Sequence, residues 1–157
     1  MKRMASLLLI FAFSMLIHAI AVAETPMVTL TPGTTMFFGS YEQDKNSDDG
    51  AEPIEWIVLT VDKSEALLIS RYALDCLPYH SVNGTASWAE SEIRSWLNGE
   101  FLAGSFSPDE QAAILSRTVI NTEDELNGNR ATSGEEDTTD RIFLLSYGEA
   151  NAYFTSN

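Results

Sequence analysis

The stretch DKNSDDGAEPIE, residues 44–55, offers oxygen ligands at spacings that could bind calcium. Asp44, Asn46 and Asp48 stand at alternating positions of an EF-hand loop, and Glu55 stands where a bidentate carboxylate belongs. The sharp turn of that loop needs a glycine, but the glycine here comes one position too late. An EF-hand also requires a helix on each side of the loop. The structure predicted for the flanking segments therefore shows whether residues 44–55 can form one.

Both flanks predict strands. Residues 36–42, MFFGSYE, are rich in aromatic side chains. Residues 54–62, IEWIVLTVD, are apolar on both faces of a strand, which is typical of a central strand. Residues 66–70, ALLIS, follow a polar turn and form the hairpin partner. We therefore reject an EF-hand and predict a solvated hairpin loop without a metal site, while weak calcium binding by acidic loops stays open.

Three helix starts follow, each with a serine three residues before a glutamate. This capping box lets the two side chains satisfy each other's free backbone amides. The three stretches are SWAE at 87–90, SPDE at 107–110 and SYGE at 146–149. Asn98-Gly99 predicts the end of the first helix.

Two more strands are predicted among these helices, at residues 117–121 and 141–146. A long acidic loop, residues 122–140, joins them, and its composition favours a mobile loop. The sequence thus predicts an α+β fold: a mixed, mainly antiparallel sheet with about three short capped helices.

The chain of 157 residues carries a formal net charge of −14. Such a surface repels phosphate backbones and anionic membranes, so we expect no nucleic-acid partner. Cys76 is the only cysteine, which excludes an intrachain disulfide and a zinc site built on thiolates. Because its neighbours in LDCLPY are mostly apolar, we predict that Cys76 is a buried small side chain.

Residues 1–23 have the features of a signal peptide: a positive start, an apolar stretch, and Ala21 and Ala23 at a cleavage site. The apolar stretch is shorter than the roughly 20 residues that a spanning helix needs. Residues 24–35 form a lead-in segment, and residues 36–157 suit a single domain. We expect a secreted or envelope protein that is not inserted in the membrane after cleavage.

Three ordered runs carry a resemblance: EPIEWIVLTVDKSEALLISRYALD, SEIRSWLNGEFLAGSFSPDEQAAI and DTTDRIFLLSYGEANAYF. Together they resemble a family of exported bacterial domains of unknown function, over roughly Phe38 to Phe154. That family is similar in pattern to C-type-lectin-like and formylglycine-generating-enzyme-like folds. Its members continue into a WWLRSP-like motif and an RPALWL-like strand, so the resemblance implies that the domain is truncated at its C-terminus.

No nucleophile, zinc-hydrolase or phosphate-loop motif occurs in the sequence, so we predict no enzyme activity and no cofactor. We expect a non-catalytic module that binds an extracellular glycan or an envelope protein. Its candidate ligand-binding residues are Trp88, Tyr79 and His80, because aromatic rings can stack on sugars. Trp88 lies at the edge of the apolar helix stripe, and its position favours packing against the core over sugar stacking, because large aromatic side chains at helix starts are usually buried.

Two alternatives stay open. One is a glycan-directed hydrolase that uses paired carboxylates, since the chain has 23 acidic residues. The other is a structural ectodomain fragment without a ligand.

Overall fold

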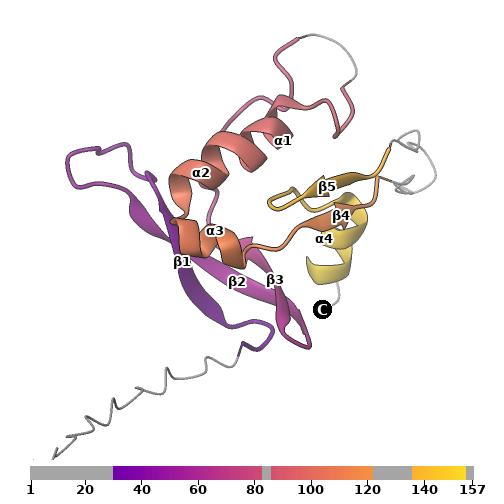
Figure 1. The fold of residues 1–157 in the computed structure, drawn as a ribbon, viewed down its shortest axis with the longest axis horizontal. Coiled ribbons are helices and arrows are strands. Elements are labelled where there is room, and N and C mark those ends of the chain that lie inside the picture. Colours follow the sequence, from indigo (N-terminus) through magenta and orange to yellow (C-terminus); the bar gives the residue numbers. More distant parts are fainter. Residues whose placement is uncertain (1–29, 83–85, 122–135, 155–157) are drawn as a thin grey trace, which may run out of the picture.

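The computed structural model describes residues 30–82, 86–121 and 136–154 (Figure 1). The predicted signal peptide lies outside the described residues, as does most of the acidic loop. Within the described ranges, no helix has the length and apolar character needed to cross a membrane.

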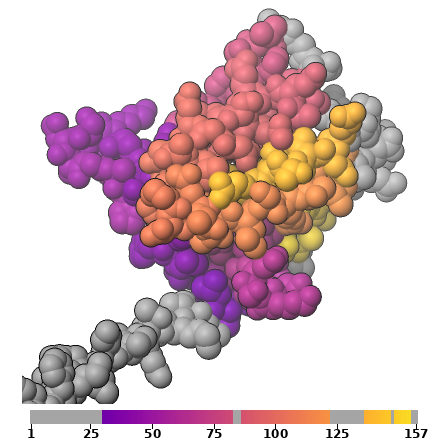
Figure 2. Space-filling model, in the orientation of Figure 1, coloured from indigo at the N-terminus to yellow at the C-terminus, as the bar shows by residue number. Residues whose placement is uncertain are grey.

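A three-stranded antiparallel sheet forms the first half. Its strands are β1 (Thr35–Tyr41), β2 (Glu52–Asp62) and β3 (Glu65–Ser70), in the order β1-β2-β3. The strand that is apolar on both faces is therefore the central one, as predicted, and Ile54 and Val58 within it are fully buried. The connection between β1 and β2 projects from one side of the molecule (Figures 1 and 2). Its flanks are strands, which confirms the rejection of an EF-hand.

One continuous helix, in three parts, covers part of this sheet. It comprises α1 (Glu92–Trp96), the π-helical turn η1 (Leu97–Phe101) and α2 (Leu102–Ser105). The predicted start at Ser87 is wrong by one turn. The Glu90 amide does donate to Ser87 Oγ at 3.2 Å, but this closes only a turn. The helix itself begins after Ser91, whose Oγ accepts from the Arg94 amide at 3.3 Å.

The predicted helix end at Asn98-Gly99 is also wrong, because the helix passes through both residues as η1. The Asn98 amide group donates to the Arg94 carbonyl at 3.1 Å and to the Ile142 carbonyl at 2.9 Å. Within the π-helical turn, one side chain thus links a helix carbonyl to a distant segment of the chain.

The other two helix starts are confirmed. In α3 (Pro108–Ala113) the Ser107 amide donates to Glu110 Oε2 at 2.8 Å, and the Glu110 amide donates back to Ser107 Oγ. In α4 (Tyr147–Phe154) Ser146 and Glu149 exchange the same two bonds, at 3.0 and 3.1 Å. Both caps are local, so the sequence alone predicts them.

A second, two-stranded sheet pairs β4 (Arg117–Val119) with β5 (Thr138–Asp140). The prediction at 117–121 is confirmed for its first three residues. The strand predicted at 141–146 is wrong, and the last residues of the predicted acidic loop form β5 instead. Asn98 Oδ1 accepts from the amides of Arg141 and Ile142 at 2.8 and 3.3 Å. The Asn98 side chain thus accepts the backbone hydrogen bonds that a neighbouring strand would accept if residues 141 and 142 were in a sheet.

The core lies between the helical layer and one face of the three-stranded sheet. Its buried cluster consists of Ile54, Trp88, Leu97, Phe101, Leu102 and Phe106. Antiparallel sheets with a few short helices confirm the predicted α+β class.

Gly39 joins the sheet to the helical layer. It sits at an irregularity in β1 with φ +72°, and its amide donates to Glu110 Oε1 at 2.9 Å. A Cβ atom here would lie 2.5 Å from the Phe106 ring and 2.8 Å from the Ser105 carbonyl oxygen. Only glycine fits this close approach between β1 and the end of α2.

We expect Gly39→Ala to lower the free energy of unfolding for two additive reasons. The left-handed backbone costs about 1–2 kcal/mol, and displacing the Phe106 ring costs about 1–3 kcal/mol. Gly50→Ala is the matched control, because Gly50 has φ +86° but open space around it, so it should show the backbone cost alone. Urea unfolding measures both. Equal losses in the two variants would contradict the proposed close contact.

Candidate functional site

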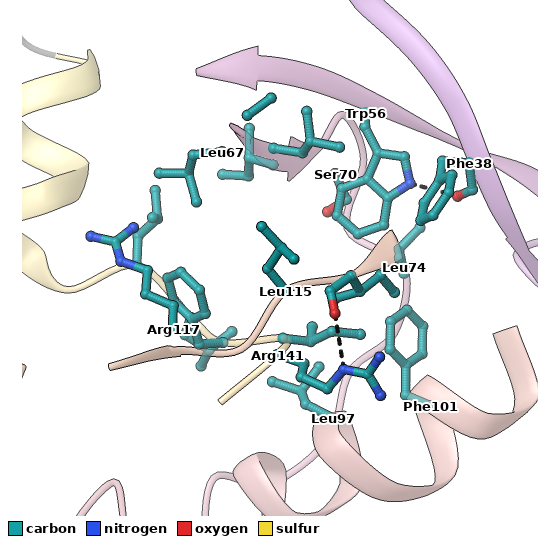
Figure 3. A pocket seen from close by; sticks show the side chains of 18 of the residues that line it. Phe38, Trp56, Leu67, Ser70, Leu74, Leu97, Phe101, Leu115, Arg117 and Arg141 are labelled. Carbon is teal, nitrogen blue, oxygen red and sulfur yellow. Dashed lines mark hydrogen bonds between the residues drawn. The ribbon is translucent and has the colours of Figure 1, made fainter. Parts of the chain in front are cut away.

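A cavity of about 1080 Å³ opens beside the core, with the three-stranded sheet on one side and segments of the second half of the chain on the other (Figure 3). In Figure 3, Leu74 and Leu115 stand between Trp56 on the sheet and the helix residues Leu97 and Phe101. The walls are mainly apolar. Most of them come from the three-stranded sheet, the α1–α2 helix, α4, and residues within 73–77, 113–117 and 141–145.

The sheet contributes to the cavity in two different ways. From β1 and β2 come alternate residues of one face, such as Met36 and Phe38. From β3, however, all six consecutive residues line the cavity. Because side chains of a strand alternate between its two faces, a cavity that every residue borders must contact the backbone of β3 as well as its side chains.

The wall opposite β3 consists of the segments 113–117 and 141–145, each of which lines the cavity continuously. Arg141 holds the two segments together, since its Nε donates to the Ile114 carbonyl at 3.1 Å and its Nη2 donates to the Gln111 carbonyl. Leu115 is 56% exposed and Leu144 is also exposed. This wall therefore presents apolar side chains that are not covered.

A third wall is the segment after β3, which Tyr41 anchors. The Tyr41 hydroxyl donates to Asp75 Oδ2 at 2.5 Å. This bond, together with partial burial, raises the pKa of Tyr41 to about 12. The same bond lowers the pKa of the Asp75 carboxyl. Leu74 and Leu77 of this segment line the cavity.

Cys76 in this segment is exposed, so the prediction of a buried thiol is wrong. The segment leaves the sheet after Ser70 and has no regular secondary structure, and the Cys76 amide is bonded to the Asp75 carboxylate at 2.7 Å. Apolar neighbours along the sequence do not bury a residue when its segment runs along the surface.

Asp140, at the end of β5, is only 2% exposed. Its carboxylate accepts from Trp88 Nε1 at 2.9 Å, from Arg94 Nε at 2.7 Å and from Thr138 Oγ1 at 2.6 Å. It thereby ties β5 to the helix and to the turn before it. With three donors around it, this buried carboxylate has its hydrogen-bonding needs met within the fold.

The three predicted ligand-binding residues lie away from the cavity. Trp88 is 8% exposed and belongs to the buried core. Tyr79 is 43% exposed, with its ring centre 6.5 Å from that of Trp88. The Tyr79 carbonyl accepts from the Glu92 amide at 3.1 Å, and His80 Nδ1 lies 3.9 Å from a Glu92 oxygen. The structure gathers these residues at the start of α1, where none of them lines the cavity.

One group of carboxylates has a geometry that could hold a cation. Oxygens of Glu42, Asp44 and Glu52 lie within 4.8 Å of one another. Each of these side chains already accepts from an amide of the same loop, for example Glu52 from Gln43 at 2.7 Å. Glu55, the predicted twelfth ligand, is bonded instead to Arg71 at 2.8 Å. Through these hydrogen bonds, the three carboxylates help to hold the conformation of the loop.

The sequence analysis did not predict the cavity, because its walls come from segments that are far apart in the chain. A partial signal was present: ALLIS is a hairpin strand without a predicted partner on its second side. An apolar strand without a predicted second neighbour indicates a sheet edge with unpaired backbone groups, to which another segment can bind.

The fold is of the α+β class, and it contains a cavity lined mainly by apolar side chains. Residues 63–157 match the family described as Domain of unknown function (DUF6273), and the chain belongs to that family. No curated protein and no solved structure matches the chain. The C-type-lectin-like resemblance therefore stays a prediction.

We expect Asp140→Ala to lower the free energy of unfolding by about 3 kcal/mol, because it leaves the Arg94 guanidinium and the Trp88 indole without their acceptor. Asp48→Ala removes an exposed loop carboxylate and should change stability by less than about 0.5 kcal/mol. Urea unfolding of both variants measures the difference. Similar stabilities would show that the Asp140 contacts do not hold the domain together.

Proposed function

We propose that this chain is an exported, non-catalytic binding module and that the cavity beside β3 is its ligand site. The observation that carries this proposal is the cavity itself. Its volume of about 1080 Å³ is at the upper limit of ordinary small-molecule pockets, which span about 300–1,000 Å³. Several separate segments converge on it, and Arg141 and Tyr41 fix two of its walls in place.

The chemistry of the walls favours a protein ligand over a glycan. Sugars are recognised through many hydrogen bonds and an exposed aromatic face, whereas this cavity is lined mainly by aliphatic and aromatic side chains. The two arginines on its walls are already engaged, Arg141 by carbonyl oxygens and Arg117 by Glu149 at 3.2 Å. The aromatic pair Tyr79 and Trp88, which was the candidate for sugar stacking, lies elsewhere.

The proposal of a non-catalytic role rests on how the carboxylates are used. Asp140 is sealed by three donors. Asp75 is held by Tyr41, and Glu110 is held by Ser107 and Gly39. Glycosidases need one carboxyl group kept protonated at neutral pH, but hydrogen bonds lower the pKa of both Asp75 and Glu110.

A neutral apolar dye, N-phenyl-1-naphthylamine, tests the site, because an accessible apolar cavity should take up such a probe whatever its natural ligand is. The dye should bind the chain saturably with increased fluorescence. Leu115→Asp places a charge on an exposed wall residue and should weaken dye binding at least tenfold. Phe37→Asp is the control: Phe37 is 68% exposed, whereas the cavity is lined by its neighbours Met36 and Phe38, on the opposite face of β1.

Thermal melting of both variants checks that each is folded. Absent dye binding, or equal binding by the two variants, would show that the cavity is not an accessible apolar site and would remove the proposal.

A further inference from the structure

We propose that the ligand of the cavity is an extended polypeptide segment of a partner protein, which adds as a strand to the free edge of β3. This inference rests on the proposed function and specifies its ligand. It is carried by the hydrogen-bonding state of β3, the pattern of wall residues along it, and the charges at the two ends of the groove.

The backbone of β3 has one side unpaired. In the part of the chain that the structure describes, β3 has β2 as its strand neighbour and no other. Val58, which stands opposite Leu68, exchanges its own hydrogen bonds with Gly33 and Thr34 on the far side of β2, at 2.8 and 2.9 Å. The peptide groups of Leu68 therefore point away from β2.

A second hydrogen bond shows independently which residues of β3 face β2 and which face away from it. The Arg71 amide donates to the Glu55 carbonyl at 2.9 Å, so Arg71 faces β2. Because peptide groups alternate along a strand, those of Ser70 and Ala66 face outward together with those of Leu68. These three residues thus offer donors and acceptors that have no strand partner among the described residues.

This edge strand itself carries few of the devices that usually prevent strand addition, although its pairing with β2 is irregular between Val58 and Thr60. Natural edge strands carry lysine, proline or a bulge that discourages a new partner. The sequence EALLIS contains neither lysine nor proline, and four of its six residues are apolar. With six residues, β3 is about 20 Å long, enough to pair with an extended segment of similar length.

The cavity sets the side-chain pattern that the added strand needs. Strand addition gives affinity through main-chain bonds and specificity through pockets for alternate side chains. Here alternate side chains of a new strand would face the apolar surface formed by Trp56, Leu115 and their neighbours. The ligand should therefore be apolar at every second residue.

Charge complementarity favours a basic partner. Asp62 and Glu65 are exposed carboxylates that line one end of the groove. Asp75 lines it near the other end, where it already accepts from the Tyr41 hydroxyl and the Cys76 amide. None of them forms an ion pair among the described residues. A second copy of this chain would add another −14 of net charge, which opposes self-association. A partner segment with lysine or arginine at one end would complement the acidic end of the groove better than a second copy of this chain would.

An array of ten-residue peptides tests this ligand class with the full chain as the probe. The array varies the spacing of apolar residues and the charge at each end. We expect captured peptides to be apolar at every second position and basic at one end. Methylation of single backbone nitrogens in the best binder should weaken binding at least tenfold at alternate positions only, because alternate amides pair with β3.

A variant of the chain tests the same edge from the other side. Ala66→Pro removes an outward amide without removing a bond to β2, since proline is tolerated on the free side of an edge strand. It should weaken binding of the best peptide at least tenfold and weaken dye binding much less. Phe37→Asp, whose side chain lies outside the cavity, should bind both normally. Thermal melting checks that each variant is folded.

The outcomes separate this inference from the proposed function. Dye binding without peptide capture, captured peptides with helical spacing, or methylation effects without alternation would each overturn strand addition and leave the apolar site intact. A concentration-dependent dimer in sedimentation that Ala66→Pro abolishes would assign the edge to a second copy and also overturn the inference. Loss of dye binding as well would remove the proposed function itself.

Discussion

The burial of one carboxylate, Asp140, is the constraint on which the arrangement of the domain depends. An ionised group in an apolar core is tolerated only when donors surround it, and here Arg94, Trp88 and Thr138 supply them. Those partners come from the helix, from the turn before it and from β5. Because the charge cannot be left unpaired, the three segments must meet at this point. The chain after Asp140 is thereby directed along the helix.

The groove is a consequence of that junction. Asn98 and Arg141 bind the residues that follow Asp140 to the helical layer and to the segment after α3, and β4 with β5 form a sheet of their own. These contacts hold the second half of the chain opposite β3 without supplying a strand that pairs with it. Among the residues that the structure describes, a short apolar strand is then paired along one edge only, beside walls that are apolar as well. This is the geometry from which we infer peptide binding.

How far the sequence could predict this structure depends on the range of each interaction. The capping boxes at Ser107 and Ser146 and the central strand were predictable, because each depends on neighbouring residues or on the alternation within one strand. The π-helical turn and the absence of a strand at 141–146 were not, because Asn98 reaches a carbonyl 44 residues away. The exposure of Cys76 and the burial of Asp140 are likewise set by tertiary contacts, and so is the cavity, which no local pattern reveals.

The open edge of β3 is the central claim, and residue-resolved amide hydrogen exchange tests it most directly. The amides of Ile69 and Arg71 face β2 and should exchange slowly, whereas those of Leu68 and Ser70 should exchange much faster although they lie in the same strand. Alternation of this kind is the predicted result. Equal protection of all four amides in the isolated chain would show that β3 is already paired on both sides, and would contradict the account.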